Sequence, residues 1–266
     1  MVYGNRKMEY LKSLVRRDNI ITDDGDNVEV FELIEIDEKA FKEWAVHFRQ
    51  NYCEDSLLDR LVSGTGMTKK EYLLKHKFPD KTEGLGPGTR SGDFAELLIS
   101  DYLEFTLKYF VPRERYRNKF NRSTSTQGTD VIGFKIGDKI SSDDELVTFE
   151  VKAQATGKKA KNRLQEAIED SYKDAVRKGE TLSALKQKYL ENHNEDKAKL
   201  IERFQNKPDR PYKEISGAAA VHDTATYSEE KIKKVETSRG PRWLIAIKRS
   251  NLFDLVHKLY EEASQC

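Results

Sequence analysis

Apolar and polar residues alternate over residues 146–153, which predicts a β-strand with two chemically different faces. One face carries only apolar side chains and suits a hydrophobic core, whereas the other carries Glu150 and Lys152. A second strand is predicted over residues 130–136, with Asp130 at its start. An acid and a lysine two residues apart are ordinarily a solvated, mutually neutralising pair, so this spacing alone does not establish a site.

The periodic patterns in the rest of the chain predict an α/β protein. A helix expected over residues 92–110 carries two apolar stripes, and Glu96 falls at the head of one of them, so its carboxylate is expected to point inward. The other expected elements are a strand at 28–36, a strand with a basic face within 113–122, an amphipathic helix from Leu164 to Gly179, buried strands within 215–222 and 242–249, and a helix from about residue 250.

Polar and glycine-rich stretches divide the chain into three parts. Residues 1–27 are polar and predict a flexible N-terminal arm. Residues 28–90 form an N-terminal α/β extension, and residues 91–266 form the main domain. The extension also has an apolar helix face, which either packs against the chain's own core or docks a partner, made of Phe41, Trp44 and Phe48.

The composition indicates a globular, soluble chain without an overall basic field. The 266 residues include 47 Lys and Arg against 46 Asp and Glu, a net charge of +1, so binding of nucleic acid would depend on local patches. There is no apolar run of about 18 residues and no leader pattern, so no membrane contact or export is predicted. Cys53 and Cys266 give neither metal-site spacing nor a disulfide framework, which favours a cytoplasmic location.

Three carboxylates and one lysine carry the candidate chemistry. If the two strands described first are neighbours, Asp130 and Glu150 can converge, and Glu96 can complete the set. Oxygen ligands without His or Cys suit Mg²⁺, or Mn²⁺. Lys152 beside them can position a water molecule or help to deprotonate it for attack on phosphorus. The pattern therefore predicts metal-dependent phosphodiester hydrolysis with these four residues as catalytic groups.

Two basic runs are candidates for gripping a phosphate backbone, with a solvated surface as the alternative for both. Gln154 and Gln165 are further candidates for a phosphate contact, against the alternative of an ordinary polar contact. The scattered histidines form no His/Glu helix pair, which argues against zinc. The basic candidates for DNA binding are Arg113, Arg115, Arg117 and Lys119 in the first run and Lys158, Lys159 and Lys161 in the second.

Short motifs in the main domain resemble the PD-(D/E)XK nuclease superfamily. In this resemblance "GTD" supplies Asp130, "EVK" supplies Glu150 and Lys152, and Glu96 is the helix acid. Thr129 stands where the motif has proline. The resemblance implies a restriction-endonuclease-like αβββαβ core, preceded here by the N-terminal α/β extension, and a nuclease domain over residues 91–266.

A longer resemblance, to the HamA family of nuclease subunits from the bacterial Hachiman anti-phage system, covers most of the chain from about residue 40. It implies DNA cleavage controlled by a HamB-type DExD/H-box helicase. The chain has no Walker A sequence, so a nucleotide-driven motor must be another protein. The matching stretches include "WAVHFRQNYC", "RSGDFAELLISDYLEF", "VPRERY", "GTDVIGFK", "DELVTFEVKAQATG", "NRLQEAIEDSYKD" and "LVHKLYEEA".

Two other functions remain compatible with the residues. A catalytically silent module of the same fold would hold DNA or dock the helicase, with the acids in a structural network. A metal-dependent RNase would use the same site, because the hydrolytic groups contact a phosphodiester and not a base.

Overall fold

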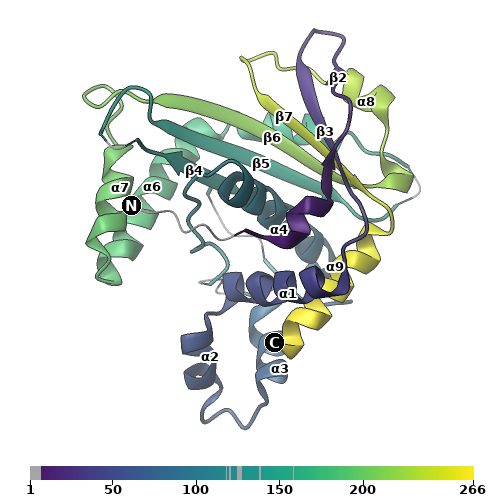
Figure 1. Ribbon diagram of the computed structural model, residues 1–266, viewed down its shortest axis with the longest axis vertical. Coiled ribbons are helices and arrows are strands. Elements are labelled where there is room, and N and C mark those ends of the chain that lie inside the picture. The colour runs from purple at the N-terminus through teal and green to yellow at the C-terminus, as the bar shows by residue number, and fades with distance from the viewer. Residues whose placement is uncertain (1–6, 118, 120, 125–127, 138, 158) are drawn as a thin grey trace.

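The computed structural model describes residues 7–117, 119, 121–124, 128–137, 139–157 and 159–266 (Figure 1). Its described strands form one sheet in the order β1-β3-β7-β6-β5-β4, with β2 paired to β3. Strands β3, β7, β6 and β5 are parallel, whereas β4 is antiparallel to β5 at one edge. The strands are β1 (Leu14–Arg16), β2 (Ile20–Ile21), β3 (Asn27–Leu33), β4 (Val131–Lys135), β5 (Glu145–Gln154), β6 (Lys213–Asp223) and β7 (Trp243–Arg249).

Helices cover both faces of the sheet. Apolar residues of α1, α4 and α9 form the larger core with one face, and α5 packs on the other. Helices α6 and α7 lie beside β4 at the sheet edge (Figure 1). The helices are α1 (Glu38–Tyr52), α2 (Asp55–Val62), α3 (Lys69–Tyr72), α4 (Gly86–Asp101), α5 (Arg163–Ser171), α6 (Asp174–Glu191), α7 (Glu195–Arg203), α8 (Glu229–Lys233) and α9 (Leu252–Gln265).

Strand β5 confirms the two-faced strand predicted from the alternating pattern. Val147, Phe149 and Val151 lie in the larger core, as the pattern requires. The ring of Phe149 lies directly over Gly217 of β6, where a Cβ atom would come within 2.5 Å of the ring. Glycine at this position therefore leaves room for the aromatic ring of Phe149 against β6.

Two predicted elements differ from the structure. Helix α4 begins at Gly86, within the stretch predicted to be a glycine-rich break, with proline in its first turn. Residues 111–117 form no strand: only Phe110 pairs with the sheet, through a single bridge to Phe134, and residues 115–117 make a turn. Basic residues of this segment instead pair with acidic side chains of α4.

The N-terminal residues are part of the main fold. Strands β1 and β2 pair with β3, and Tyr10 is buried at 1% exposure, where it stacks on Trp44 at 4.0 Å between ring centroids. Residues 8–27 are thus held in place, in contrast to the flexible arm that the sequence predicts for residues 1–27. Residues 1–6 lie outside the described part of the chain.

The N-terminal extension shares both sheet and core with the main domain. Strand β3 pairs in parallel with β7. Phe41, Trp44 and Phe48 are all buried in the core that also contains residues of β5 and β7. These three aromatics are therefore core residues, and they offer no docking surface. In the described part of the chain, no helix is long and apolar enough to cross a membrane.

The role of the N-terminal segment can be tested at Tyr10, whose hydroxyl donates a 2.6 Å hydrogen bond to Asp101. Tyr10→Ala should lower the free energy of unfolding by about 3–5 kcal/mol, because it removes a buried aromatic ring. The exposed Lys12 is the matched control, and Lys12→Ala should change stability by less than about 0.5 kcal/mol. Urea denaturation of both variants measures the difference, and equal stabilities would contradict the packing described here.

Candidate functional site

Asp130 lies at the end of the β4–β5 ladder, beside the charged face of β5. Val131 pairs with Phe149, and Asp130 Oδ2 accepts a 3.0 Å hydrogen bond from the backbone N–H of Val151. Val151 is the residue between Glu150 and Lys152, so the two strands bring Asp130 to the Glu-x-Lys pair as predicted. Gly128, with φ +97°, makes the turn that leads into β4.

Glu150 is buried at 3% exposure and surrounded by charges of both signs. Lys152 Nζ donates to its Oε1 at 2.9 Å, and Arg177 of α6 reaches its Oε2 at 3.4 Å. Burial and the charge of Asp130 raise the pKa of Glu150 to about 7. Burial and the neighbouring carboxylate thus outweigh the two cations that contact Glu150.

Lys152 is held as a charged ammonium group. Its Nζ lies 2.7 Å from Oδ2 of Asp170 on α5, in addition to its contact with Glu150. Burial alone would lower the pKa of Lys152, but these two carboxylates raise it above its ordinary value. In this arrangement Lys152 suits the role of a hydrogen-bond donor or positive charge better than that of a proton acceptor.

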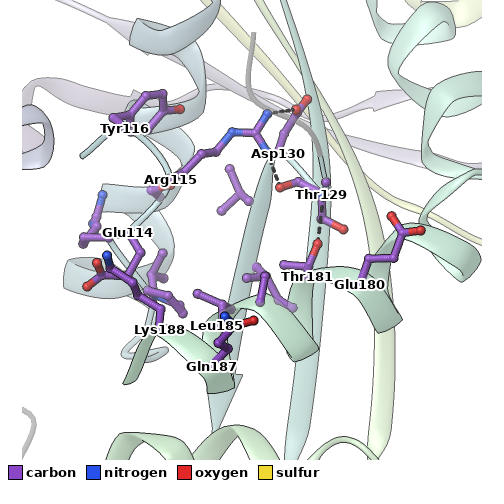
Figure 2. A pocket seen from close by; sticks show the side chains of 18 of the residues that line it. Glu114, Arg115, Tyr116, Thr129, Asp130, Glu180, Thr181, Leu185, Gln187 and Lys188 are labelled. Carbon is purple, nitrogen blue, oxygen red and sulfur yellow. Dashed lines mark hydrogen bonds and ion pairs between the residues drawn. The ribbon is translucent and has the colours of Figure 1, made fainter. Parts of the chain in front are cut away.

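Glu96 points inward from α4, as its apolar surroundings predicted, and it reaches Asp130 through Arg115. The guanidinium group of Arg115 lies 3.0 Å from Glu96 Oε2 and 2.7 Å from Asp130 Oδ1. Figure 2 shows the side chain of Arg115 on the wall of a cavity, with its guanidinium group pointing toward Asp130 and the carbonyl of Thr129. Burial raises the pKa of Glu96 to about 8, although the charge of Arg115 opposes this effect.

Carboxylate oxygens are the ligands that a hard divalent cation prefers. Of the three predicted acids, however, Glu96 does not converge with Asp130 and Glu150. Among the described residues, no group of three or more His, Cys, Asp and Glu side chains is placed to hold a metal ion. Asp130 and Glu150 are the pair that would hold Mg²⁺, because they are adjacent oxygen donors whose mutual repulsion a cation would relieve. Glu96 is separated from them by Arg115.

Three of the four cations of the first basic run pair with acids of α4 and of the helical turn that follows it, η3 (Tyr102–Thr106). They meet this helix in reverse order along the chain, from its C-terminal end toward its middle. Their charges neutralise buried or half-buried carboxylates, and their binding to DNA stays a prediction. The pairs are Arg113 with Asp101 and Glu104, Arg115 with Glu96, and Lys119 with Asp93, while Arg117 pairs with Glu54 and Glu114.

Gln154, two residues beyond Lys152 on β5, holds the second basic run. Its side chain donates to the carbonyl of Lys159 at 2.9 Å and accepts from the N–H of Lys161 at 2.8 Å. The side chains of both lysines are exposed, and Lys158 lies outside the described residues. Gln154 is thus a clamp that fixes a basic loop to the end of the strand that carries Glu150.

Gln165 makes ordinary polar contacts within the protein, and its contact with a phosphate stays a prediction. Its Oε1 accepts a 2.9 Å hydrogen bond from the N–H of Glu236, which ties α5 to a distant loop. By contrast, Asp170 and Arg177 contact the proposed catalytic groups and were not predicted. Their helical positions carry no local signal, since only the fold brings α5 and α6 to the charged face of β5.

A cavity of about 590 Å³ opens beside Asp130. It lies between residues 111–116, the start of β4 and helix α6, and Figure 2 shows side chains from all three lining it. Arg115 and Asp130 stand on its wall, so the cavity gives access to one side of the acidic site. Much of the remaining wall is apolar and comes from Leu97, Val111, Val131, Ile132 and Leu185.

Comparison with known proteins identifies the family. The family model of HamA matches residues 8–263, which include every element that forms the site. No curated protein matches the chain. The chain therefore belongs to the HamA family, and with it to Hachiman anti-phage defence.

Proposed function

We propose that this chain is a Mg²⁺-dependent deoxyribonuclease of PD-(D/E)XK type, the effector of a two-component anti-phage system. One observation carries the proposal: Asp130 is hydrogen-bonded to the backbone between Glu150 and Lys152. The order of α4, the Phe110 bridge, β4, β5, α5 and β6 supports a restriction-endonuclease-like αβββαβ core in which the first strand is reduced to one bridge. Membership of the HamA family supports the role in defence.

In this proposal each side chain has a distinct task. Asp130 and Glu150 would hold Mg²⁺, or Mn²⁺, which supplies Lewis-acid stabilisation of charge on the phosphoryl oxygens. Lys152, kept charged and oriented by Asp170, donates a hydrogen bond to the attacking water or to the phosphate. Arg115 holds Asp130 and Glu96 in place while the site contains no divalent cation.

The catalytic assignment is tested by Asp130→Asn, Glu150→Gln and Lys152→Ala in the full chain. Each should reduce cleavage by at least about 100-fold, because each removes a group that stabilises charge in the reaction. Glu96→Gln should reduce it less, since Glu96 reaches Asp130 only through Arg115. The substrates are plasmid, linear duplex, single-stranded DNA and RNA, with Mg²⁺ or with chelator.

Matched controls are the exposed Glu229→Gln and Lys39→Ala, which change the same charges away from the site. Circular dichroism verifies folding. A folded variant that cuts at the parent rate would remove that residue from the catalytic set. Complete inactivity of the parent on every substrate would favour the silent binding module, and activity on RNA alone would favour the RNase.

DNA binding is tested at the loop that Gln154 holds. The double change Lys159→Gln and Lys161→Gln should weaken binding and reduce the slope of log affinity against log salt by about 0.9 for each lysine that neutralises a duplex phosphate. Lys39→Gln with Lys42→Gln, two exposed lysines of α1, is the control. Fluorescence anisotropy at several salt concentrations gives the slope. A slope equal to that of the control would place the DNA path elsewhere.

Control by a HamB-type DExD/H-box helicase is the remaining part of the proposal. A free, unspecific deoxyribonuclease would damage its host, so we expect a stable complex in which cleavage is low until ATP turnover or engagement of a DNA end. The docking surface lies outside Phe41, Trp44 and Phe48, because these residues are buried. Co-expression, size-exclusion chromatography and cleavage assays with and without ATP test this control. Separate elution, with full cleavage whether or not the helicase is present, would exclude it.

A further inference from the structure

The cavity beside Asp130 has a buried part and a mouth of different chemistry. Its volume of about 590 Å³ lies in the range of pockets that enclose small organic groups. The buried part is lined by apolar side chains with little exposure, whereas the mouth is formed by exposed residues of α6. The buried part includes Leu97, Val111, Val131 and Ile132, and the mouth includes Glu180, Ala184, Gln187 and Glu191.

Hydrogen bonds fix the wall of the cavity next to the proposed metal ligands. The backbone N–H of Thr129 donates to the hydroxyl of Thr181 at 3.2 Å, which ties the start of β4 to α6. Arg115 donates to the carbonyl of Thr129 and lies 2.7 Å from Asp130 Oδ1. In Figure 2, Arg115 and Asp130 lie at one side of the cavity and Gln187 at the other. The cavity is thus a preformed part of the fold that reaches Asp130.

The charges around this cavity favour an uncharged occupant over a phosphate group. Its two arginines, Arg113 and Arg115, each contact two carboxylates already. Among the described lining residues, four carboxylates stand against three cations, so a phosphate would gain no net attraction. A flat group with hydrogen-bonding edges fits better, because apolar walls accept its faces and carboxylates accept hydrogen bonds from its amino groups. The carboxylates are Glu114, Asp130, Glu180 and Glu191, and the cations are Arg113, Arg115 and Lys188.

A second cavity, of about 360 Å³, adjoins the first and has the opposite balance of charge. Glu114 and Lys188 line both cavities. Among the described residues that line the second cavity, four cations stand against two acids, which favours a phosphate group there. The two adjoining cavities therefore match the two parts of a nucleotide strand, the uncharged base and the charged backbone. The cations are Lys77, Arg117, Lys188 and Lys197, and the acids are Glu54 and Glu114.

We propose that the cavity beside Asp130 binds one unpaired base of a DNA strand, next to the phosphate on which the site acts. The inference rests on the proposed function and extends it to the class of substrate, because a base can enter a cavity only when it has left its pair and its stack. Substrates are therefore single strands, or duplexes that contain unpaired nucleotides. Tyr116 gives the wall an aromatic side chain, the type on which bases stack.

Base-dependent binding tests this inference without a cleavage step. The probes are two labelled single-stranded DNA oligonucleotides of equal length and charge, one of thymidines and one in which every nucleotide is abasic. With chelator present, fluorescence anisotropy should show that the full chain binds the thymidine strand at least about 10-fold more tightly, because contact of a base with aromatic and apolar side chains stabilises the bound strand. Equal binding of the two strands would overturn the inference.

Filling the mouth of the cavity should remove this preference. Ala184→Trp adds an indole ring at the mouth and should bring the two affinities to within about twofold of each other. Ser183→Trp is the matched control, because it adds the same ring at the neighbouring exposed position, about 100° further round α6, and should keep the preference. Gln187→Trp fills the same mouth one turn further along the helix. Circular dichroism verifies folding, and a preference retained by both filling variants would contradict the inference.

Cleavage assays separate this inference from the proposed function. The parent should cut a single strand at least about 10-fold faster than the matched duplex, and Ala184→Trp should lose that difference. Cleavage of DNA by a parent without base-dependent binding defeats this inference alone, whereas base-dependent binding without cleavage of any substrate defeats the proposed function alone. If Ala184→Trp and Gln187→Trp lose binding of the helicase and keep the preference for the thymidine strand, the cavity belongs to the partner and the inference is overturned.

Discussion

The neutralisation of buried carboxylates on α4 determines how the chain is arranged around this helix. Asp93, Glu96 and Asp101 lie inside the protein, where an unpaired charge would be strongly unfavourable, and removal of a partner from such a pair costs about 3–5 kcal/mol. Arg113, Arg115 and Lys119 supply the cations, and residues 113–117 form no strand. Asp101 shows how complete the pairing is: burial alone would raise its pKa, but His47 and Arg113 hold the pKa at about 2.

Buried carboxylates are neutralised less completely where β4 and β5 meet at Asp130 and Glu150. Arg115 is shared between Glu96 and Asp130, and Lys152 is shared between Glu150 and Asp170. Each cation therefore serves two acids, and the pKa values of Glu96 and Glu150 remain raised. An excess of buried negative charge is expected where a protein binds a divalent cation, because the ion replaces the missing positive charge when it arrives.

Sequence patterns predicted the parts of the fold that depend on neighbouring residues. The alternation at 146–153 fixed the two faces of β5, and a short connection made β4 its antiparallel partner, so Asp130 was correctly expected beside Glu150. The strand predicted from the basic alternation at 113–119 was wrong, because Arg113, Arg115 and Lys119 pair with acids of α4 and their spacing does not reflect the face of a strand. Asp170 and Arg177 had no local signal at all, since only the fold brings α5 and α6 to Lys152 and Glu150.

A hydrogen bond to the buried carboxylate of Asp101 connects the N-terminal segment to the site. The hydroxyl of Tyr10 donates to Asp101, which also binds Arg113, and Arg115 lies two residues further along the same segment. Arg115 then contacts Asp130. The N-terminal residues thus support the segment that holds the site's carboxylates, although they are far from it in sequence. Residues 91–266 and the N-terminal extension are therefore one structural unit, because ion pairs around the site join the two.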